Sequence, residues 1–509
     1  MERRGRARVE PPGLDMTRWP EHPLLLEINT WSWLREFSTA AGTRITLADV
    51  PQPELERIAA LGFDGVWLMG VWERSPRSRE IASSIPDLVA EYERALPDLI
   101  AADVIGSPYA VHRYEVDDML GGPDALAVLR TRLRQVGLRL VLDFVPNHLA
   151  IDHSWVAEYP NRFVHAGADR LASEPQNYFT REIDGTQRIF AHGRDPHYNG
   201  WTDTVQLDYR TQETRFAMRE LVAEIAEQCD GIRCDMAMLI LPEVFVRTWG
   251  GEFEPNADLW SDAIGRVKAR HPAFVFIGEV YWDLEYQLQQ LGFDYTYDKR
   301  LYDRLVNADA DSLRAHLRAN VEFQRRLVRF IENHDEPRAA AIFGAERSRA
   351  AAVLAFTVPG MRLVHDGQIE GRRVKLPVQL GRRPAETSDL LMQAHYQRLL
   401  RAVSDPVFHE GAWQLLEPQP AGIGESYRGF IAHHWSLGDA RRLVIVNWSA
   451  AQAQCFVPLE LPALAGTSWQ LRDLLGSASY QRRGDELLDP GLYLDMPAYA
   501  YHLFDLRRP

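Results

Sequence analysis

The stretch LRLVLDFVPNH, residues 138–148, is a continuous apolar run that carries one carboxylate and ends on polar residues. An apolar run without alternation predicts a strand buried on both faces, as in a parallel sheet. Seven more short runs have this character, at residues 24–28, 65–69, 231–235, 274–280, 293–297, 327–331 and 361–364. Helix-period segments, such as 124–136 and 211–228, separate them. Eight strands alternating with helices predict an α/β chain closed into a (β/α)8 TIM barrel, with a doubly wound sheet as the rival architecture.

Two parts of the chain depart from the alternation of strands and helices. The interval after the third predicted strand is too long for one crossover helix, and it is rich in His, Asn, Tyr, Trp and Asp. We expect residues 149–205 to form an inserted loop subdomain there, on the face where barrels carry their active-site loops. Beyond residue 404 strand-like runs replace the long helices, which predicts a C-terminal all-β sandwich over 405–509. The barrel then spans 23–404, behind a flexible N-terminal leader at 1–22.

The composition argues against several classes of partner. The 509 residues hold 57 Lys and Arg against 71 Asp and Glu, a formal net charge of −14, whereas a nucleic-acid partner needs a basic face. No apolar stretch approaches the ~18 residues of a membrane span, and the N-terminus has no apolar segment like that of a secretory signal. The three cysteines, Cys229, Cys234 and Cys455, lack metal-binding spacing, which favours reduced thiols in the cytoplasm. Nothing in the sequence indicates an oligomeric state.

Carboxylates stand at the ends of four predicted strands. They are Asp143 in LVLDFVPNH, Asp235 in GIRCD, Glu279 in FIGEV and Asp335 in FIENHD. In a barrel these ends meet at one mouth, where repulsion and burial separate the pKa values of neighbouring carboxyl groups. A single such residue is usually a cap or an ion-pair partner, whereas four of them with Asn, His or Arg nearby indicate acid–base chemistry.

The segments DFVPNH, GIRCD, GEV and ENHD resemble, in this order and spacing, the four signature segments of the α-amylase family, glycoside hydrolase family 13. The resemblance extends over roughly residues 24–509. It implies that Asp235 is the catalytic nucleophile, Glu279 the general acid/base, and Asp335 the third carboxylate, which binds sugar hydroxyls. The implied mechanism is double displacement with retention, for which the two reacting carboxyl groups stand about 5–5.5 Å apart.

The same resemblance implies a substrate-binding set around these residues. Arg233, two positions before the nucleophile, would hold that carboxylate ionised, since a guanidinium is always charged and donates two parallel hydrogen bonds. His148 and His334 match two histidines that bind the sugar at the cleavage point, and Asp143 matches a carboxylate that orients the group. Tyr109, in GSPYAVHRY, resembles a tyrosine that stacks on the same sugar.

The chain departs from the family pattern beyond the nucleophile. Many amylases have Lys-His three and four residues after it, and this chain has Met238 and Leu239. In those relatives the lysine meets the sugar beyond the cleavage point, and the histidine carbonyl binds calcium. Asn147 matches another calcium ligand of the family, but the inserted segment 149–205, here called the excursion, offers no companion carboxylate cluster. We therefore expect no metal and no cofactor, with calcium at Asn147 as the alternative.

Other polar residues are candidates for the acceptor side of the cleft. The segment HSWVAEYPNRFVHAG, residues 153–167, resembles relatives that transfer maltosyl units from a phosphorylated donor. The candidates for sugar contacts are His192, His197, Trp201 and Asp208 in the excursion, and Gln368, Glu370 and Arg372 after the eighth predicted strand. Packing within their own loops is the competing explanation for all of them.

The residues and the resemblance together imply a retaining α-glucosidase or α-amylase-type hydrolase that cleaves α-glucosidic bonds of short α-glucans or α-glucosides. The alternative is an intracellular α-glucan transglycosylase, 4-α-glucanotransferase or maltosyltransferase-like, because the two activities share every catalytic residue. A binding subunit without catalysis would lack a catalytic carboxylate, and an unrelated barrel would need a metal-ligand cluster or a Gly-rich phosphate loop. The expected partner is an oligosaccharide or small α-glucoside, with neither nucleic acid nor membrane.

Overall fold

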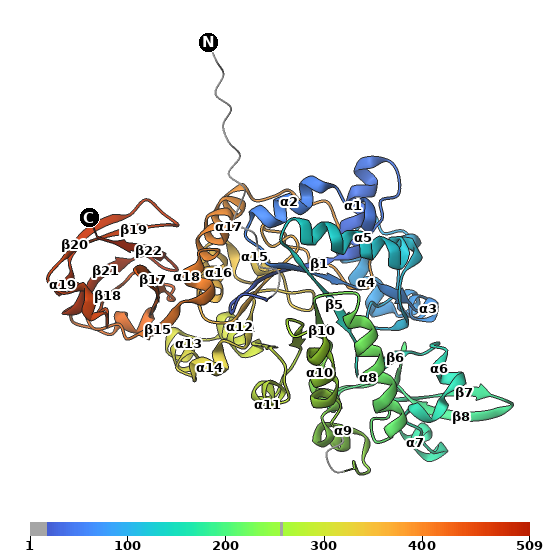
Figure 1. Ribbon diagram of the computed structural model, residues 1–509. Helices are drawn as coiled ribbons and strands as arrows, with labels where there is room; N and C mark the ends of the chain where they lie inside the picture. Colours follow the sequence, from blue (N-terminus) through green and yellow to red (C-terminus); the bar gives the residue numbers. More distant parts are fainter. Residues whose placement is uncertain (1–17, 255–257, 509) are drawn as a thin grey trace.

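The structure is a computed structural model that describes residues 18–254 and 258–508. A barrel lies at the centre, a second β-rich part lies at one side, and the segment coloured cyan-green extends at the other side (Figure 1). Residues 1–17 of the expected leader lie outside the described residues. His22, at the end of that predicted segment, is fully buried, and its Nδ1 accepts a hydrogen bond from the Gly360 N–H at 3.1 Å.

Eight parallel strands close into a barrel in the order β1-β14-β13-β12-β11-β10-β5-β2. Their bounds are Leu24–Asn29 (β1), Gly65–Met69 (β2), Arg139–Phe144 (β5), Gly231–Cys234 (β10), Val275–Gly278 (β11), Tyr295–Tyr297 (β12), Leu327–Arg329 (β13) and Met361–His365 (β14). Every residue of these strands is buried, which accounts for apolar runs without alternation. The closed parallel order confirms the TIM barrel and excludes the doubly wound sheet.

Helices surround the barrel and cover its outer face. Both helices predicted from their periodicity form, as α5, Gly122–Gln135, and α8, Gln212–Ala226. The Thr211 side chain caps α8 by accepting a hydrogen bond from the Thr214 N–H. The other helices of this part are α1 Thr30–Ala41, α2 Gln52–Ala60, α3 Pro76–Ser84, α4 Pro86–Ala95, α9 Pro242–Trp249, α10 Leu259–Arg270, α11 Glu285–Gln290, α12 Lys299–Asn307, α13 Ala310–Leu317, α14 Val321–Gln324, α15 Ala339–Ile342, α16 Gly344–Thr357 and α17 Leu390–Val403. A short antiparallel pair, β3 (Trp72–Arg74) with β4 (Val111–Val116), follows β2.

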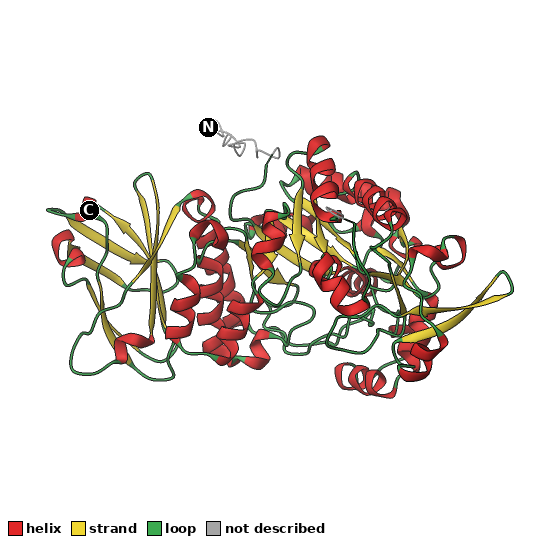
Figure 2. Ribbon diagram, turned by 90° about the horizontal axis from the view of Figure 1, so that it is seen from below, coloured by secondary structure: helices red, strands yellow, loops and turns green. Residues whose placement is uncertain are grey.

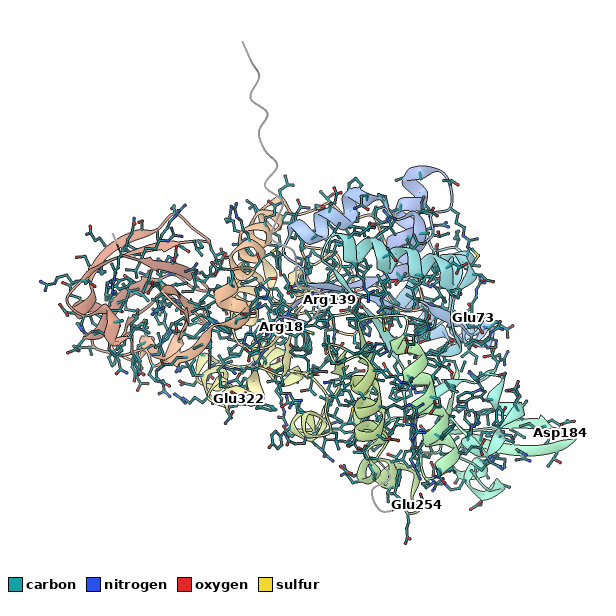
Figure 3. The ribbon with its side chains drawn as sticks, viewed as in Figure 1. Arg18, Glu73, Arg139, Asp184, Glu254 and Glu322 are labelled. Atoms are coloured by element: carbon teal, nitrogen blue, oxygen red, sulfur yellow. The ribbon has the colours of Figure 1, made fainter. Side chains whose placement is uncertain are left out.

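The excursion after β5 forms a subdomain whose two ends pair with each other. Strand β6, His148–Ala150, pairs antiparallel with β9, Thr204–Gln206, and this pairing returns the chain to the barrel. Between them lie α6 Trp155–Glu158, α7 Ala168–Ser173, β7 Tyr178–Ile183 and β8 Thr186–Ala191. The hairpin β7–β8 turns at Asp184 and Gly185, both with positive φ, and Figure 3 shows Asp184 at its outer end.

The C-terminal part is an antiparallel β domain with its own core. Its larger sheet has the order β15-β16-β17-β22-β19-β20, and β18 pairs with β21 in a second sheet. The bounds are β15 Ala412–Leu416, β16 Phe430–Leu437, β17 Ala440–Asn447, β18 Ala453–Val457, β19 Ser468–Asp473, β20 Ser479–Arg483, β21 Leu492–Met496 and β22 Tyr501–Arg507, with α18 Pro406–Glu410 before them and α19 Gly484–Leu488 within. Figure 2 shows these strands apart from the barrel, with helices in between. The predicted all-β domain is confirmed.

Two side chains of this domain contact the end of one barrel helix. The Trp435 indole donates a hydrogen bond to the carbonyl of Thr357, the last residue of α16, and His433 Nε2 lies 3.0 Å from the same carbonyl.

None of the helices in the two described ranges is both long enough and apolar enough to cross a membrane.

Candidate active site

Three neighbouring strands bring the predicted carboxylates to one guanidinium. In the sheet register Arg233 of β10 lies beside Asp143 of β5, and the residue before Asp235 lies beside the residue before Glu279. Arg233 has no exposed surface, and its Nη1 lies 2.8 Å from Asp235 Oδ1 while its Nη2 lies 2.6 Å from Glu279 Oε2. The predicted nucleophile and the predicted acid/base are therefore held by the two ends of a single side chain, with Asp143 Oδ1 at 3.6 Å from Nη1.

Aromatic rings enclose this guanidinium. Its carbon lies 5.2 Å from the ring centroid of Trp67, 5.3 Å from that of Tyr109 and 5.7 Å from that of Tyr297. The Arg233 Nε also donates to the Tyr297 hydroxyl at 3.3 Å. Rings and carboxylates replace water around a buried charge, which makes each remaining electrostatic contact stronger than it would be in solvent.

Asp143 is fixed from below the site by two donors. The Trp67 indole N–H donates to its Oδ1, and the Gly70 N–H donates to its Oδ2, both at 3.1 Å. Burial raises the pKa of Asp143 to about 6, against the pull of the nearby Arg233 charge. Both oxygens of Asp143 are therefore engaged inside the protein, and its side chain is buried beside Arg233.

Glu279 is held on both of its oxygens. The Tyr281 hydroxyl donates to Oε1 at 2.6 Å, and the Met236 N–H donates to Oε2 at 2.8 Å. Met236 directly follows Asp235 and has a φ of 41°, a left-handed conformation that a side chain of this size rarely adopts. The Met236 N–H thus links the backbone next to the predicted nucleophile to the predicted acid/base.

Burial and neighbouring charges act in opposite directions on the Asp235 carboxyl group. Burial raises the pKa of Asp235, the charges of Glu279 and Asp335 add to the rise, and Arg233 opposes it. The contact with Arg233 at 2.8 Å favours the ionised form of Asp235, as the resemblance implied, and burial opposes it.

His334 joins the third carboxylate to the tyrosine. Its Nε2 lies 3.0 Å from Asp335 Oδ2 and 2.7 Å from the Tyr109 hydroxyl, and the rings of His334 and Tyr109 stack at 5.4 Å. The Asp335 side chain is 47% exposed, so its carboxylate faces solvent. Although burial works against it, the carboxylates of Asp335 and Glu27 raise the pKa of His334 to about 10.

His148 stands on the opposite side, where the excursion begins. It is buried, and its ring lies 5.1 Å from the ring of Trp201, also in the excursion. Burial lowers the pKa of His148 to about 4, which favours the neutral ring. Its Nδ1 lies 3.3 Å from the Asn147 side-chain nitrogen, so Nε2 is the nitrogen that could meet a hydroxyl.

The structure also adds residues that the sequence analysis did not single out. They are Glu27, which contacts His334; Trp67, Tyr281 and Tyr297, described above; and Lys375, whose Nζ donates to the Asp335 carbonyl. Only Glu27 left a signal in the sequence, as a charged residue inside the apolar run 24–28.

Most acceptor-side candidates serve contacts within the protein. His192 Nδ1 lies 2.9 Å from the Thr204 carbonyl, and Asp208 pairs with Arg210 at 2.7 Å. Gln368 is buried, and it accepts from the His365 N–H and donates to the Tyr396 hydroxyl. Arg372 pairs with Glu36 at 3.2 Å, and the Glu370 carbonyl accepts a hydrogen bond from the Asp389 N–H at 2.9 Å. His197 is the exception, because it is exposed and its ring lies 5.0 Å from that of Trp282, three residues after Glu279.

The oxygens of Asn147 are occupied by an amide. Gln206 is fully buried, and its Nε2 donates to the Asn147 carbonyl at 2.9 Å, to Asn147 Oδ1 at 3.0 Å and to the Leu207 carbonyl at 3.1 Å. Calcium prefers six to eight oxygen ligands that include carboxylates. Within the described ranges no group of three His, Cys, Asp or Glu side chains could hold a metal ion. The oxygens around Asn147 are therefore arranged to accept hydrogen bonds from the Gln206 amide, and they do not supply the ligands that a divalent cation needs.

Comparisons with known proteins agree with this geometry. Residues 52–375, well over half of the chain, match the model of the alpha-amylase catalytic domain. Alpha-amylase 3 of Dictyoglomus thermophilum is 22% identical over 304 residues, which are 56% of this chain and 57% of the relative. An alpha-1,4-glucan:maltose-1-phosphate maltosyltransferase of Burkholderia pseudomallei is 25% identical over 52% of this chain and 20% of its own length. The chain thus spans little more than half of the amylase relative, and less of the transferase.

Solved structures show the same fold along nearly the whole chain. A maltogenic alpha-amylase from Thermotoga neapolitana superposes with a TM-score of 0.67 at 18% identity, covering 96% of this chain and 99% of that one. An alpha-amylase from Geobacillus thermoleovorans, solved with acarbose, gives the same TM-score, identity and coverage. Because the alpha-amylase catalytic-domain model matches more than half of the chain, the chain belongs to the alpha-amylase family.

Proposed function

We propose that this protein is a retaining glycosidase that hydrolyses α-glucosidic bonds of short α-glucans or α-glucosides by double displacement. The observation that carries the proposal is the Arg233 guanidinium, which contacts Asp235 and Glu279 with its two terminal nitrogens. One guanidinium spans only carboxyl groups that stand close together. Its geometry favours the ~5–5.5 Å separation of retaining enzymes over the wider gap that inverting enzymes need for a water molecule.

The residues have these roles in the proposed reaction. Asp235 attacks the anomeric carbon while Glu279 protonates the leaving oxygen, and Glu279 then takes a proton from the water that opens the glycosyl-enzyme. The Tyr281 hydroxyl can donate or accept, so it accommodates Glu279 in both protonation states. Asp335, exposed to the cleft, binds sugar hydroxyls together with His334 and His148, and Tyr109 stacks on the same sugar.

The second candidate function is α-glucan transglycosylation. Met238 and Leu239, at the positions of Lys and His in many amylases, are buried and uncharged. The rings of His197 and Trp282, which contact each other, are the candidates for binding an acceptor sugar. An aromatic acceptor side favours a sugar over water as the group that opens the intermediate. The relative from Burkholderia pseudomallei is named for such a transfer.

The deciding experiment is a product time-course on maltose, maltotriose, isomaltose, trehalose, sucrose and maltose 1-phosphate, read by chromatography and by anomeric proton NMR. Free glucose or maltose in proportion to substrate lost, first released as the α-anomer, supports retaining hydrolysis. Longer products that precede free sugar establish transglycosylation, and a β-anomer as first product overturns retention.

We further propose that the protein holds no resident calcium, because the Gln206 amide satisfies the oxygens of Asn147. The cytoplasmic location stays a prediction, which rests on three free, buried cysteines.

A further inference from the structure

Glu27 is a carboxylate with no exposed surface in the middle of the first barrel strand. Its neighbours in β1 are apolar on both sides, and in the sheet it lies beside Trp67 of β2 and His365 of β14. A buried carboxylate is costly unless a nearby charge or several donors compensate it. Its presence inside an otherwise apolar strand therefore calls for a specific partner.

That partner is His334. Glu27 Oε1 lies 2.5 Å from His334 Nδ1 and accepts from the His334 backbone N–H at 3.3 Å. Glu27 Oε2 is buried, and across the described residues it has no hydrogen-bond partner. His334 is thus the hydrogen-bond partner of this carboxylate, and His365, beside it in the sheet, adds a favourable charge.

The other nitrogen of the same ring also faces acceptors. His334 Nε2 lies 3.0 Å from Asp335 Oδ2 and 2.7 Å from the Tyr109 hydroxyl. A neutral imidazole carries one N–H, whereas an ionised carboxylate can only accept. A ring with a carboxylate at hydrogen-bond distance from each nitrogen satisfies both only when it carries two protons. Geometry alone therefore favours the imidazolium.

We propose that Glu27 is a positioning residue that keeps His334 doubly protonated and directed at Asp335 and Tyr109, so that Asp335 meets the substrate ionised. Glu27 acts through His334 and does not contact the sugar. This inference rests on the proposed function, which makes Asp335 a sugar-binding carboxylate. It also explains why an acidic residue is placed between Leu26 and Ile28 in a buried strand.

The charged and ionisable groups around the ring come from several elements of the barrel. They are Glu27 of β1, Asp143 of β5, Arg233 of β10, His365 of β14, Tyr109 in the loop before β4, Asp335 beside the ring, and Lys375 after β14. Burial lowers the pKa of His334, and the two carboxylates in direct contact raise it to about 10. Removal of the Glu27 charge leaves burial opposed mainly by Asp335, so the ring should lose its second proton at a lower pH.

The test uses Glu27→Gln in the full-length protein. Glutamine keeps the shape and can still accept from Nδ1–H, but it carries no charge. The protonation of His334 is followed by NMR of ¹³Cε1-labelled histidine, with His334→Gln to assign the signal. In the wild type we expect His334 to stay protonated through pH 8. In E27Q we expect its titration to fall by about one pH unit or more, and the alkaline limb of kcat for maltotriose to fall with it.

Glu332→Gln is the matched control. Glu332 is another fully buried glutamate near the strand ends, and it pairs with Arg338 and His365 and not with His334. E332Q should lower the melting temperature without moving the His334 titration.

A wild-type His334 that titrates near its ordinary pKa would overturn the proposal, even if E27Q fails to fold. An unchanged titration in folded E27Q would also overturn it. The NMR titration does not depend on turnover, so failure of the proposed hydrolase activity is distinguishable from failure of this inference.

Discussion

Arg233 and Glu279 lie 2.6 Å apart on two adjacent parallel strands, and neither side chain is exposed by more than a few per cent. The same guanidinium reaches Asp235 at 2.8 Å. Because both carboxyl groups contact one buried cation at the ends of paired strands, the strand register positions the predicted nucleophile and the predicted acid/base. We therefore expect single substitutions at these positions to have distinct effects on turnover and on stability.

Asp235→Asn and Glu279→Gln should each lower kcat by several orders of magnitude, because each removes a group that reacts in the proposed mechanism, and a lost nucleophile costs about 10⁴-fold or more. Both replacements keep shape and can still contact Arg233. The melting temperature should therefore change little, and circular dichroism should be unchanged. Near-normal turnover by either variant would remove that residue from the reaction.

Tyr281→Phe should lower kcat for maltotriose about 10-fold with little effect on KM. The Tyr281 hydroxyl donates to Glu279 Oε1, and a hydrogen bond to a charged group contributes about 1.5–3 kcal/mol. The matched control is Tyr286→Phe, because Tyr286 on α11 is 60% exposed. Equal kinetics for both variants would show that Tyr281 does not act on the acid/base.

Chelation with EDTA should leave the melting temperature and activity of the wild type unchanged. Gln206→Glu should lower the melting temperature in EDTA, because it replaces the amide donor by a carboxylate facing the oxygens of Asn147 and Leu207. Added calcium should restore part of that loss. Gln290→Glu, on an exposed position of α11, is the control. A wild type that is destabilised by EDTA and restored by calcium contradicts the prediction.

Acid should weaken the contact between the barrel and the C-terminal domain. Burial lowers the pKa of His433 to about 3, from an ordinary value near 6.5. A depressed pKa contributes stability that is present above the unfolded value and is lost as the pH falls toward the folded value. The loss is about 1.4 kcal/mol for each pH unit in that window. His433→Gln should reduce the slope of melting temperature between pH 6 and pH 4.

The control for this slope is His165→Gln, because His165 is exposed in the excursion. It should leave the pH dependence of the melting temperature unchanged. An H433Q slope equal to that of the wild type would place the acid sensitivity elsewhere.

The sequence alone was sufficient for the barrel and for the identity of its candidate reacting residues. Strands buried on both faces need uninterrupted apolar residues, and the acidic residues follow those runs directly along the chain. Asp235 and Glu279 could be singled out because their positions relative to strand ends are local properties, and Arg233 followed from the resemblance to the α-amylase family. Their roles remain predictions, and the structure contributes the contacts on which the tests depend.

Only the tertiary structure decided which side chains from distant parts of the chain meet inside the barrel. Glu27 and His334 are 307 residues apart, and closure of β1 against β14 brings the two ends of the barrel together. Gln206 reaches Asn147 because β9 pairs with β6, a long-range pairing with no local signature. Strand register and barrel closure arise from the packing of the whole chain, and for that reason no local pattern could show that Glu27 meets His334 or that Gln206 meets Asn147.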